Sequence, residues 1–353
     1  MTATIDQSPD QRMRQAAIVG QRQAALVDVP KPQPKADWVV VKIHTAPLCT
    51  EYKAFVAGRT GQGFGHEAAG EVVEVAQPGR VQLGDRVVVM PQYPCGKCSL
   101  CLAGNYIHCQ NIIDFVQFSG AEFGRATIAQ YLLKPDWLLV PIPDGISYDH
   151  AAMACCGLGP TFGAFELMQL DRFDTVLITG LGPVGLGGVI NARYRGARVI
   201  GVESQPWRAA KALELGAEAV IDPGDETALA QIMALTGGQG VDKVVDCSGA
   251  PAAHRLGIDA LRPKGQLAFV GESGADTTIQ SSRDMLRKGL TLLGAWHYNL
   301  KDSPKLMRVI ADSGPQLDRF ISHRFSLTQI QQAWEIQAGG DCAKVLIKPW
   351  EDG

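Results

Sequence analysis

The sequence predicts an α/β protein with two units, a β-rich unit and a doubly wound parallel sheet of six strands. Three observations support this prediction. The chain has 353 residues, enough for about two domains at roughly 150 residues each. Residues 14–143 consist of short β-branched runs separated by Pro and Gly, whereas strand-like and helix-like runs alternate after about Gly157. Four of the nine cysteines lie close together, between Cys95 and Cys109.

The composition is that of an ordinary globular protein, with 46% hydrophobic and 20% charged residues. Lys and Arg number 33 and Asp and Glu number 36, so no basic excess favours nucleic acid. We find neither the apolar segment of a secretory signal nor a membrane-length apolar run. We therefore expect a cytoplasmic protein without nucleic-acid or membrane partners. In such a reducing compartment, clustered cysteines favour metal binding over disulfides.

In the first unit we expect a polar tail over residues 1–13, followed by strands such as Val39–Ile43, Glu71–Val75 and Arg86–Met90. Helices alternate with strands in the second unit, which indicates βαβ connections and a parallel sheet. The expected helices include Trp207–Leu215, Glu226–Leu235 and Pro251–Leu261. The expected strands are Val176–Thr179, Arg198–Val202, Ala219–Ile221, Lys243–Asp246, Gln266–Val270 and Leu290–Leu293. Six strands is the full count of a doubly wound dinucleotide-binding sheet.

The pattern changes again after about Ala295. We expect a helix near Pro304–Ala311, followed by the segment Arg319–Phe325. Next come a helix over Leu327–Gln337, capped by Ser326 or Thr328, and a strand over Lys344–Ile347. This tail is expected to return to the β-rich unit. The predicted domains are therefore residues 1–157 with 297–353, and residues 158–296.

The clustered cysteines have the spacing C-x2-C-x2-C-x7-C. The four ligands are Cys95, Cys98, Cys101 and Cys109. Four thiolates from one short loop can close a tetrahedral zinc site with no open position, which makes such a site structural. An iron–sulfur run begins similarly, but it expects the fourth cysteine after three residues, followed by Pro. Here seven residues intervene and Gln110 follows, so the spacing favours zinc.

A second, dispersed metal site is indicated by Cys49, by His66 beside Glu67, and by the pair Cys155 and Cys156. Two cysteines and one histidine leave a tetrahedral zinc with an open fourth position, which is the composition of a catalytic site. An open zinc can polarise an alcohol or carbonyl oxygen. A histidine before a glutamate is by itself a weak signal.

A glycine-rich loop, Gly180-Leu-Gly182-Pro183-Val184-Gly185, follows a predicted strand and opens a helix, as in dinucleotide-binding units. Glu203 ends the next strand, where a carboxylate binds the ribose hydroxyls and repels a 2′-phosphate. This favours NAD over NADP, although Arg208 could accommodate that phosphate or lie over the adenine. The residues that this pattern predicts to bind the cofactor are Gly180, Gly182, Pro183, Val184, Gly185, Glu203 and Arg208.

These features, in this order, resemble the zinc-dependent medium-chain dehydrogenase/reductase family of alcohol and polyol dehydrogenases. The resemblance runs from about Gln15 to Pro349 and is carried mainly by the four-cysteine lobe, Gly65-His66-Glu67 and Gly180–Gly185. It implies a GroES-like catalytic domain and a Rossmann domain, with NAD and two zinc ions per chain. It also adds Val270 and Lys344 to the residues expected to bind the cofactor. It also implies a homodimer or homotetramer that pairs through the last strand of the nucleotide-binding sheet, about Leu290–Leu293.

By the same resemblance, Cys49, His66 and Cys156 hold the catalytic zinc, and Glu67 is a second carboxylate near it. Cys156 is preferred to its neighbour because Gly157 follows it directly. The family commonly reads Cys-x-Thr/Ser-Asp, whereas this chain reads Cys49-Thr50-Glu51-Tyr52. We therefore expect Glu51 to replace the hydroxyl as general base or first proton relay, and Thr50 to serve only if the backbone shifts by one residue.

The expected reaction is oxidation of a secondary alcohol to a ketone by hydride transfer to NAD. Glu51, the polar run His297-Tyr298-Asn299 and a short segment between Cys49 and His66 favour a polyol, cyclitol or sugar derivative as substrate. Two alternatives stay open. One is an NADPH-dependent reductase of aldehydes, ketones or enones from the same family, and the other is a non-catalytic protein that binds zinc and NAD.

Overall fold

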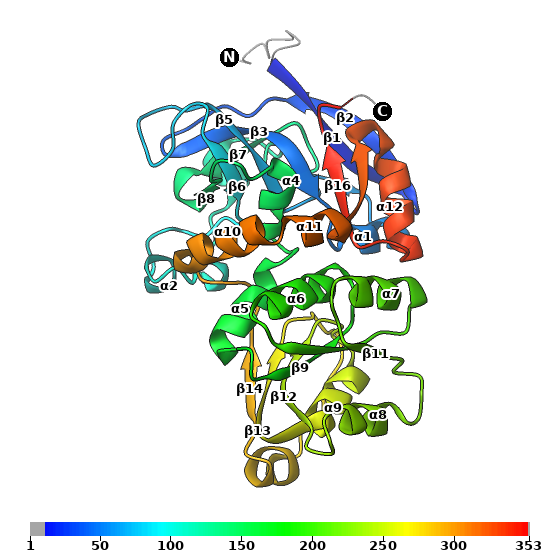
Figure 1. The fold of residues 1–353 in the computed structure, drawn as a ribbon. Coiled ribbons are helices and arrows are strands. Elements are labelled where there is room, and N and C mark those ends of the chain that lie inside the picture. Colours follow the sequence, from blue (N-terminus) through cyan, green and yellow to red (C-terminus); the bar gives the residue numbers. More distant parts are fainter. Residues whose placement is uncertain (1–10, 352–353) are drawn as a thin grey trace. The chain divides into compact units, whose positions relative to one another are not determined.

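The computed structural model describes residues 11–351, which form two compact units (Figure 1). The first unit runs to Cys155 and also takes in residues 321–340 and 344–351. The second comprises residues 156–320 and 341–343. Both are built as the sequence predicts, a β-rich unit and a parallel α/β unit, which confirms the predicted fold class.

Residues 297–320, which we expected in the first unit, pack with the second. Lys305 Nζ lies 2.7 Å from Glu166 Oε2, and the hydroxyl of Tyr194 donates to Asp312 Oδ2 over 2.8 Å. The chain returns to the first unit at Ile321. There Asp149 binds Arg324 at 2.8 Å and Lys348 at 2.7 Å, so two strands of the C-terminal tail share one carboxylate of the first unit.

The first unit is built on a seven-stranded sheet and a three-stranded sheet. The larger sheet has the order β15-β16-β3-β5-β6-β8, with β7 also paired to β3, and the smaller has the order β2-β1-β4. The strands are β1 (Arg12–Gly20), β2 (Gln23–Pro30), β3 (Trp38–Pro47), β4 (Gly61–Gln62), β5 (Ala68–Glu74), β6 (Arg86–Val89), β7 (Tyr131–Pro135), β8 (Leu139–Pro141), β15 (Ile321–Ser326) and β16 (Lys344–Lys348). The helices are α1 (Glu51–Ala57), α2 (Ser99–Leu102), α3 (Phe115–Ser119), α4 (Tyr148–Ala151) and α12 (Ile330–Gly339).

The N-terminal tail is shorter than predicted, because β1 begins at Arg12 and Met13 is only 1% exposed. The rest of the predicted tail, residues 1–10, lies outside the described residues. At the other end, Ser326 accepts from the N–H of Gln329 in a capping box, which is one of the two expected caps. A 3-10 turn over Leu327–Gln329 then leads into α12.

Strand register brings three distant parts of the chain to one end of the large sheet. β3 ends at Pro47, just before Cys49, and its residue Thr45 pairs with Ala69 near the start of β5. Leu346 of β16 pairs with Pro47. Because β3 runs antiparallel to both β5 and β16, Cys49, Glu67 and Lys344 lie at the same end of the sheet.

The second unit contains a six-stranded parallel sheet of order β11-β10-β9-β12-β13-β14, which is the predicted doubly wound arrangement. The strands are β9 (Thr175–Thr179), β10 (Arg198–Val202), β11 (Ala219–Ile221), β12 (Val241–Asp246), β13 (Leu261–Phe269) and β14 (Thr291–Gly294), which confirms all six predictions. The helices are α5 (Gly159–Met168), α6 (Pro183–Tyr194), α7 (Pro206–Glu214), α8 (Ala228–Leu235), α9 (Pro251–Ala260), α10 (Ser303–Asp312) and α11 (Gly314–Phe320).

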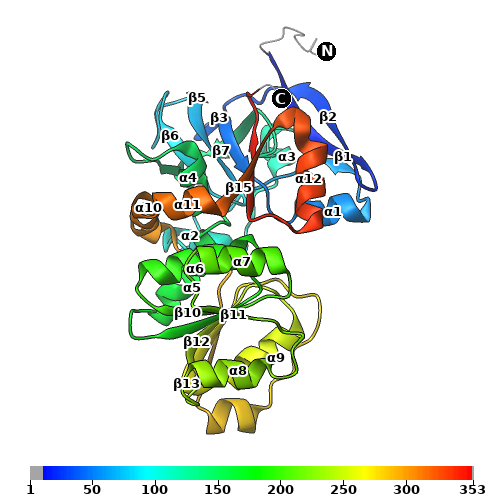
Figure 2. The ribbon, with the colours of Figure 1, turned by 45° about the vertical axis from the view of Figure 1, so that its right-hand side comes forward.

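Helices cover both faces of this sheet: α6 and α7 lie along one face and α8 and α9 along the other (Figure 2). Leu177, Val244 and Leu267 of three strands are fully buried in one core with Ile232 and Ile258 of α8 and α9. Because all six strands run parallel, their carboxyl ends lie along one edge, where ligands bind in such sheets.

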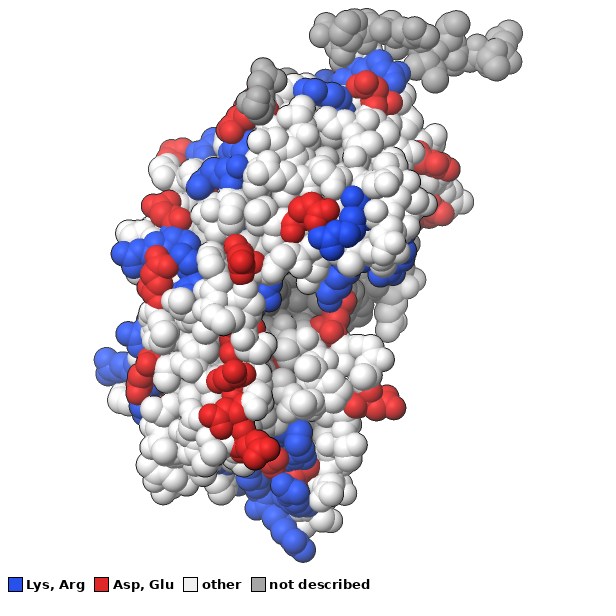
Figure 3. Space-filling view, turned by 90° about the vertical axis from the view of Figure 1, so that its right-hand side faces the viewer, with Lys and Arg blue, Asp and Glu red and all other residues white. Residues whose placement is uncertain are grey.

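On the face shown in Figure 3, acidic and basic side chains are interspersed. Among the described residues, no single helix is long and apolar enough to cross a membrane. The segments 148–154 and 159–168 reach that length and apolar character only when taken together, and they are bent by 46° to one another.

Candidate metal centres and cofactor loop

The four predicted structural ligands meet in the first unit. The ligand sulfurs of Cys95, Cys98, Cys101 and Cys109 all lie within 4.8 Å of one another. The Sγ–Sγ distances are 3.5 Å for Cys98–Cys101, 3.6 Å for Cys95–Cys109 and 3.9 Å for Cys98–Cys109. A tetrahedral zinc with bonds of about 2.3 Å requires sulfurs about 3.8 Å apart, so the cluster fits the ion.

The loop affects its thiols differently, since burial raises the pKa of Cys101 whereas that of Cys95 is lowered. The N–H groups of Cys95 and Asn111 donate to Cys109 Sγ over 3.3 and 3.4 Å. The backbone N–H of Lys97 lowers the pKa of Cys95 to about 6. Because zinc binds the thiolate, a lowered thiol pKa favours metal binding at neutral pH.

The second predicted cluster also assembles, with ligand atoms of Cys49, His66, Glu67 and Cys156 within 4.8 Å of one another. Two thiols and one imidazole suit a zinc with one position left for substrate, and the carboxyl group of Glu67 lies beside these three donors. Cys155, the alternative third ligand, is absent from this cluster. Its buried thiol donates to the carbonyl of Val89 over 3.4 Å, and burial raises its pKa.

Glu51 has a different place from the one expected. Its side chain is 7% exposed, with Oε1 2.9 Å from His66 Nδ1 and Oε2 accepting the N–H of Cys49 over 2.8 Å. Burial would raise the pKa of Glu51, but the hydrogen bond and charge of His66 lower it. Burial would lower the pKa of His66, but contacts with Cys49 and Glu51 raise it to about 11. These contacts give Glu51 a positioning role toward both ligands, and its role as a base stays a prediction.

A carboxylate on Nδ1 is the usual arrangement around a metal-binding histidine, because it fixes the tautomer and leaves Nε2 for the metal. The hydroxyl of Thr50 caps no N–H of α1, and Thr50 is exposed beside Cys49. Gln337 of α12, which sequence reasoning missed, donates to the carbonyl of Cys49 over 3.2 Å. No local sequence signal identifies Gln337, because it comes from the far end of the chain.

Lys344 also differs from expectation, since its ammonium group binds Glu67. Lys344 Nζ lies 2.7 Å from Glu67 Oε1, and the two side chains are 1% and 0% exposed. Burial raises the pKa of Glu67 to about 7, against the attraction of Lys344. The expected cofactor role of Lys344 stays a prediction.

The glycine loop has the expected form in the second unit. Gly180 adopts φ +81°, and a Cβ there would lie 2.7 Å from Ser248 Cβ. A Cβ on Gly185 would lie 2.0 Å from the carbonyl oxygen of Gly180, so the helix approaches the strand as predicted. Gly182 faces open space, with room for a ligand at the start of α6, where Pro183 and Val184 open the helix. Backbone N–H groups at such a terminus bind phosphate.

The remaining cofactor candidates lie around the same sheet edge. Glu203 follows β10, accepting the N–H of Leu181 over 2.8 Å and those of Ser204 and Gln205 over 3.0 Å. Arg208 lies in the first turn of α7, and half-buried Val270 directly follows β13. Their contacts with a cofactor stay predictions.

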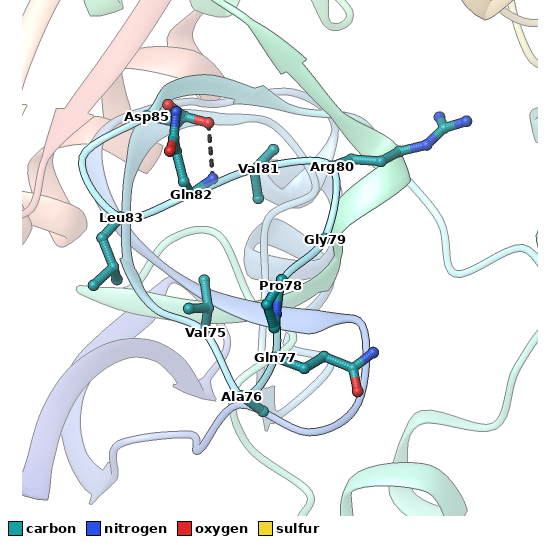
Figure 4. Close-up of a pocket in the computed structure, with 10 residues that line it drawn as sticks. All are labelled: Val75, Ala76, Gln77, Pro78, Gly79, Arg80, Val81, Gln82, Leu83 and Asp85. Atoms are coloured by element: carbon teal, nitrogen blue, oxygen red, sulfur yellow. Dashed lines mark hydrogen bonds between the residues drawn. The ribbon is translucent and has the colours of Figure 1, made fainter.

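Two other features contribute no ligand to either metal cluster. His297 and Tyr298, which suggested a polar substrate, are 7% and 3% exposed. The ring of Tyr298 packs edge-on against that of Phe162, with the ring centroids 5.9 Å apart. A cavity of about 770 Å³ lies within the loop between β5 and β6 (Figure 4). Its lining includes Val75, Val81 and Leu83 but no member of either metal cluster.

Comparison with known proteins agrees with this geometry. Residues 35–144 match the alcohol dehydrogenase GroES-like domain, and residues 183–312 match the zinc-binding dehydrogenase domain. A zinc-type alcohol dehydrogenase-like protein of Escherichia coli (strain K12) is 31% identical, covering 95% of this chain and 98% of the relative. The D-arabitol-phosphate dehydrogenase of Enterococcus avium is 30% identical, with 93% and 95% covered. The structure of alcohol dehydrogenase TADH from Thermus sp. ATN1 superposes with a TM-score of 0.84 at 25% identity, covering 95% and 99% of the two chains.

The neighbouring cysteines give a matched test of the metal sites. We expect two zinc ions per chain in the wild type, and one in Cys156→Ser because the open cluster loses a thiolate. Cys155→Ser keeps a donor for Val89 and should retain both ions. Elemental analysis of purified protein measures this, and loss of an ion from Cys155→Ser alone would contradict the assignment.

Glu51→Gln separates positioning from base catalysis. Because Glu51 orients His66, we expect the catalytic cluster to lose zinc affinity by roughly 10- to 100-fold while the four-cysteine site keeps its ion. Chelator competition measures both affinities. Glu71→Gln, a carboxylate 3.9 Å from His44, is the control. Unchanged zinc affinity with lost turnover and an altered pH profile would instead support the base role.

Proposed function

Because the chain belongs to the zinc-dependent alcohol dehydrogenase family, we propose that it oxidises a secondary alcohol to a ketone with NAD. The observation that carries this proposal is the cluster of Cys49, His66 and Cys156, whose composition leaves one metal position for substrate. The glycine loop at Gly180 and the carboxylate of Glu203 support the choice of NAD. We place this activity in the cytoplasm, where the six clustered thiols stay reduced.

Cys49, His66 and Cys156 would hold the zinc, and Glu51 fixes the orientation of His66. When bound, zinc would supply Lewis-acid polarisation of an alcohol oxygen, and NAD would supply the hydride acceptor. Because the contacts of Glu51 direct it toward His66 and the N–H of Cys49, we assign the first proton transfer to the hydroxyl of Thr50, an exposed residue beside Cys49. A hydroxyl can receive and donate a proton at once, which suits a relay.

We propose a polar substrate, a polyol, cyclitol or sugar derivative. The short segment between Cys49 and His66 supports this choice because it leaves room for a larger, hydroxylated molecule. The Enterococcus avium relative is a dehydrogenase of a sugar-alcohol phosphate. The polar run at His297 no longer contributes, since His297 and Tyr298 are buried in the second unit.

A panel of polyols, cyclitols, sugars and simple alcohols tests the function by NADH absorbance. We expect turnover of a polar secondary alcohol, with NAD preferred to NADP. Glu203→Ala should weaken NAD binding by roughly ten- to hundredfold, because a charged hydrogen bond to the ribose is lost. Tight NADPH binding with reduction of aldehydes or enones would favour the reductase alternative. Zinc and NAD binding without turnover would favour the non-catalytic one.

We also propose that the chain forms a homodimer, or a tetramer of such dimers, through β14. This strand ends the six-stranded sheet, and its residue Leu293 is half-buried in the single chain. An unprotected sheet edge of low charge favours pairing with another strand, and a two-fold axis makes such an interface self-complementary.

A charge on that edge tests the assembly. We expect the wild type to sediment as an even-numbered oligomer and Leu293→Lys as a smaller species, because lysine on an edge strand blocks pairing. Leu213→Lys, a substitution at an exposed position on α7, should leave the oligomer intact. Analytical ultracentrifugation decides, and a monomeric wild type at micromolar concentration would contradict the proposal.

A further inference from the structure

Asp246, the last residue of β12, is a fully buried carboxylate in the second unit. Its Oδ1 accepts the hydroxyls of Thr179 over 2.7 Å and Ser248 over 2.6 Å. Its Oδ2 accepts the N–H of Gly249 over 2.9 Å. A buried charge is stable only when hydrogen bonds satisfy it, so these contacts make Asp246 a fixed anchor at the carboxyl end of the sheet.

His254 of α9 connects this anchor to a different loop. Its Nε2 lies 3.0 Å from Asp246 Oδ2, and its Nδ1 lies 2.6 Å from the hydroxyl oxygen of Thr277. The ring is 3% exposed and packs edge-on against Phe269 at 5.0 Å. A carboxylate only accepts, so Nε2–H donates to Asp246, and in the neutral ring Nδ1 accepts from Thr277. His254 therefore ties the loop after β13 to the end of β12.

That loop lies against the others that form the cofactor edge. A Cβ on Gly180 would lie 2.7 Å from Ser248, and a Cβ on Gly249 would lie 2.1 Å from the carbonyl oxygen of Glu272. The loops that follow β9, β12 and β13 are therefore in direct contact at the carboxyl ends of the strands. Only hydrogen side chains fit at Gly180 and Gly249, so the three loops are fixed against one another.

The sheet order places loop 271–277 in one half of the nucleotide site. A doubly wound sheet contains two mononucleotide-binding halves that meet where the strand order reverses. Here that point lies between β9 and β12, with Gly180 and Glu203 on the β9–β11 half. If those residues bind the adenosine half of NAD, the β12–β14 half takes the nicotinamide nucleotide. Thr277 belongs to this second half.

We propose that His254 is a positioning residue that fixes loop 271–277 for the nicotinamide half of the cofactor, through its two hydrogen bonds to Asp246 and Thr277. This inference rests on the proposed use of NAD. The proposed role differs from a purely structural one in one respect. It requires that loss of these hydrogen bonds weakens binding of the nicotinamide half and not of the adenosine half.

Two neighbouring threonines give a matched pair of variants. Thr277→Val removes the hydroxyl that binds His254 and keeps the shape of the side chain. Thr278→Val makes the same change at the next residue, which is exposed. Both act on a loop outside the metal cluster, so zinc content should equal that of the wild type in each.

The decisive measurement is calorimetric binding of NAD and of ADP-ribose, which lacks the nicotinamide, to the zinc-loaded protein. We expect Thr277→Val to weaken NAD binding by roughly three- to tenfold, the range of one lost neutral hydrogen bond. Binding of ADP-ribose should weaken by less than about twofold. Thr278→Val should change neither affinity. The KM for NAD should rise in Thr277→Val while the KM for the alcohol stays the same. His254→Phe, which removes both hydrogen bonds, should lower NAD affinity further.

Equal weakening of both ligands in Thr277→Val would show a general structural role and overturn the inference. Unchanged NAD affinity in that variant, with the wild type binding both ligands, would overturn it alone and leave the proposed function standing. A wild type that binds neither ligand would overturn the proposed cofactor and this inference together.

Discussion

The buried ion pair between Lys344 and Glu67 connects the C-terminal strand to the metal site. Both side chains are almost inaccessible to water, and their charged atoms lie 2.7 Å apart. Removing one partner of such a pair leaves an uncompensated charge and costs about 3–5 kcal/mol. Because Lys344 begins β16, which pairs with the end of β3, the same contact also holds the strand that leads to Cys49. The chain's return after its second unit is thus part of building the metal centre.

The charges at that centre explain why a divalent ion suits it. Two thiols and two carboxyl groups, those of Glu51 and Glu67, converge on one region beside the buried Lys344. Burial raises the pKa of Glu67 to about 7, against the attraction of Lys344. Contacts with Cys49 and Glu51 raise the pKa of His66, because a proton there supplies positive charge. Zinc would supply it instead and release that proton.

Much of the fold and of the candidate metal sites could be predicted from the sequence, because these features depend on short-range patterns. The periods of strands and helices identified all six parallel strands, and the spacing of Cys95 to Cys109 identified their cluster. The contacts of Glu51 could not be predicted in this way. Helical side chains lean toward the N-terminus, so Glu51, the first residue of α1, turns back to the N–H of Cys49 and to His66. The pairs Lys344–Glu67 and His254–Thr277 join separate elements, and no local pattern encodes such contacts. Residues 297–320 were predicted in the wrong unit for a similar reason, because an apolar helix face does not specify which unit it packs on.

The nine cysteines divide by environment, and that division determines how the chain responds to oxidation. Cys155, Cys247 and Cys342 have no place in either cluster, and burial raises the thiol pKa of Cys155 and Cys247. A thiol kept protonated is a poor nucleophile, so Cys155 and Cys247 behave as small apolar side chains. The six others converge in two groups, where Cys95 has a pKa lowered to about 6 and its sulfur lies 3.6 Å from that of Cys109. Without a bound ion, an external oxidant would convert a thiolate this close to a second thiol into a disulfide. A zinc ion bound in the four-cysteine lobe would therefore both hold the loop and keep its sulfurs reduced.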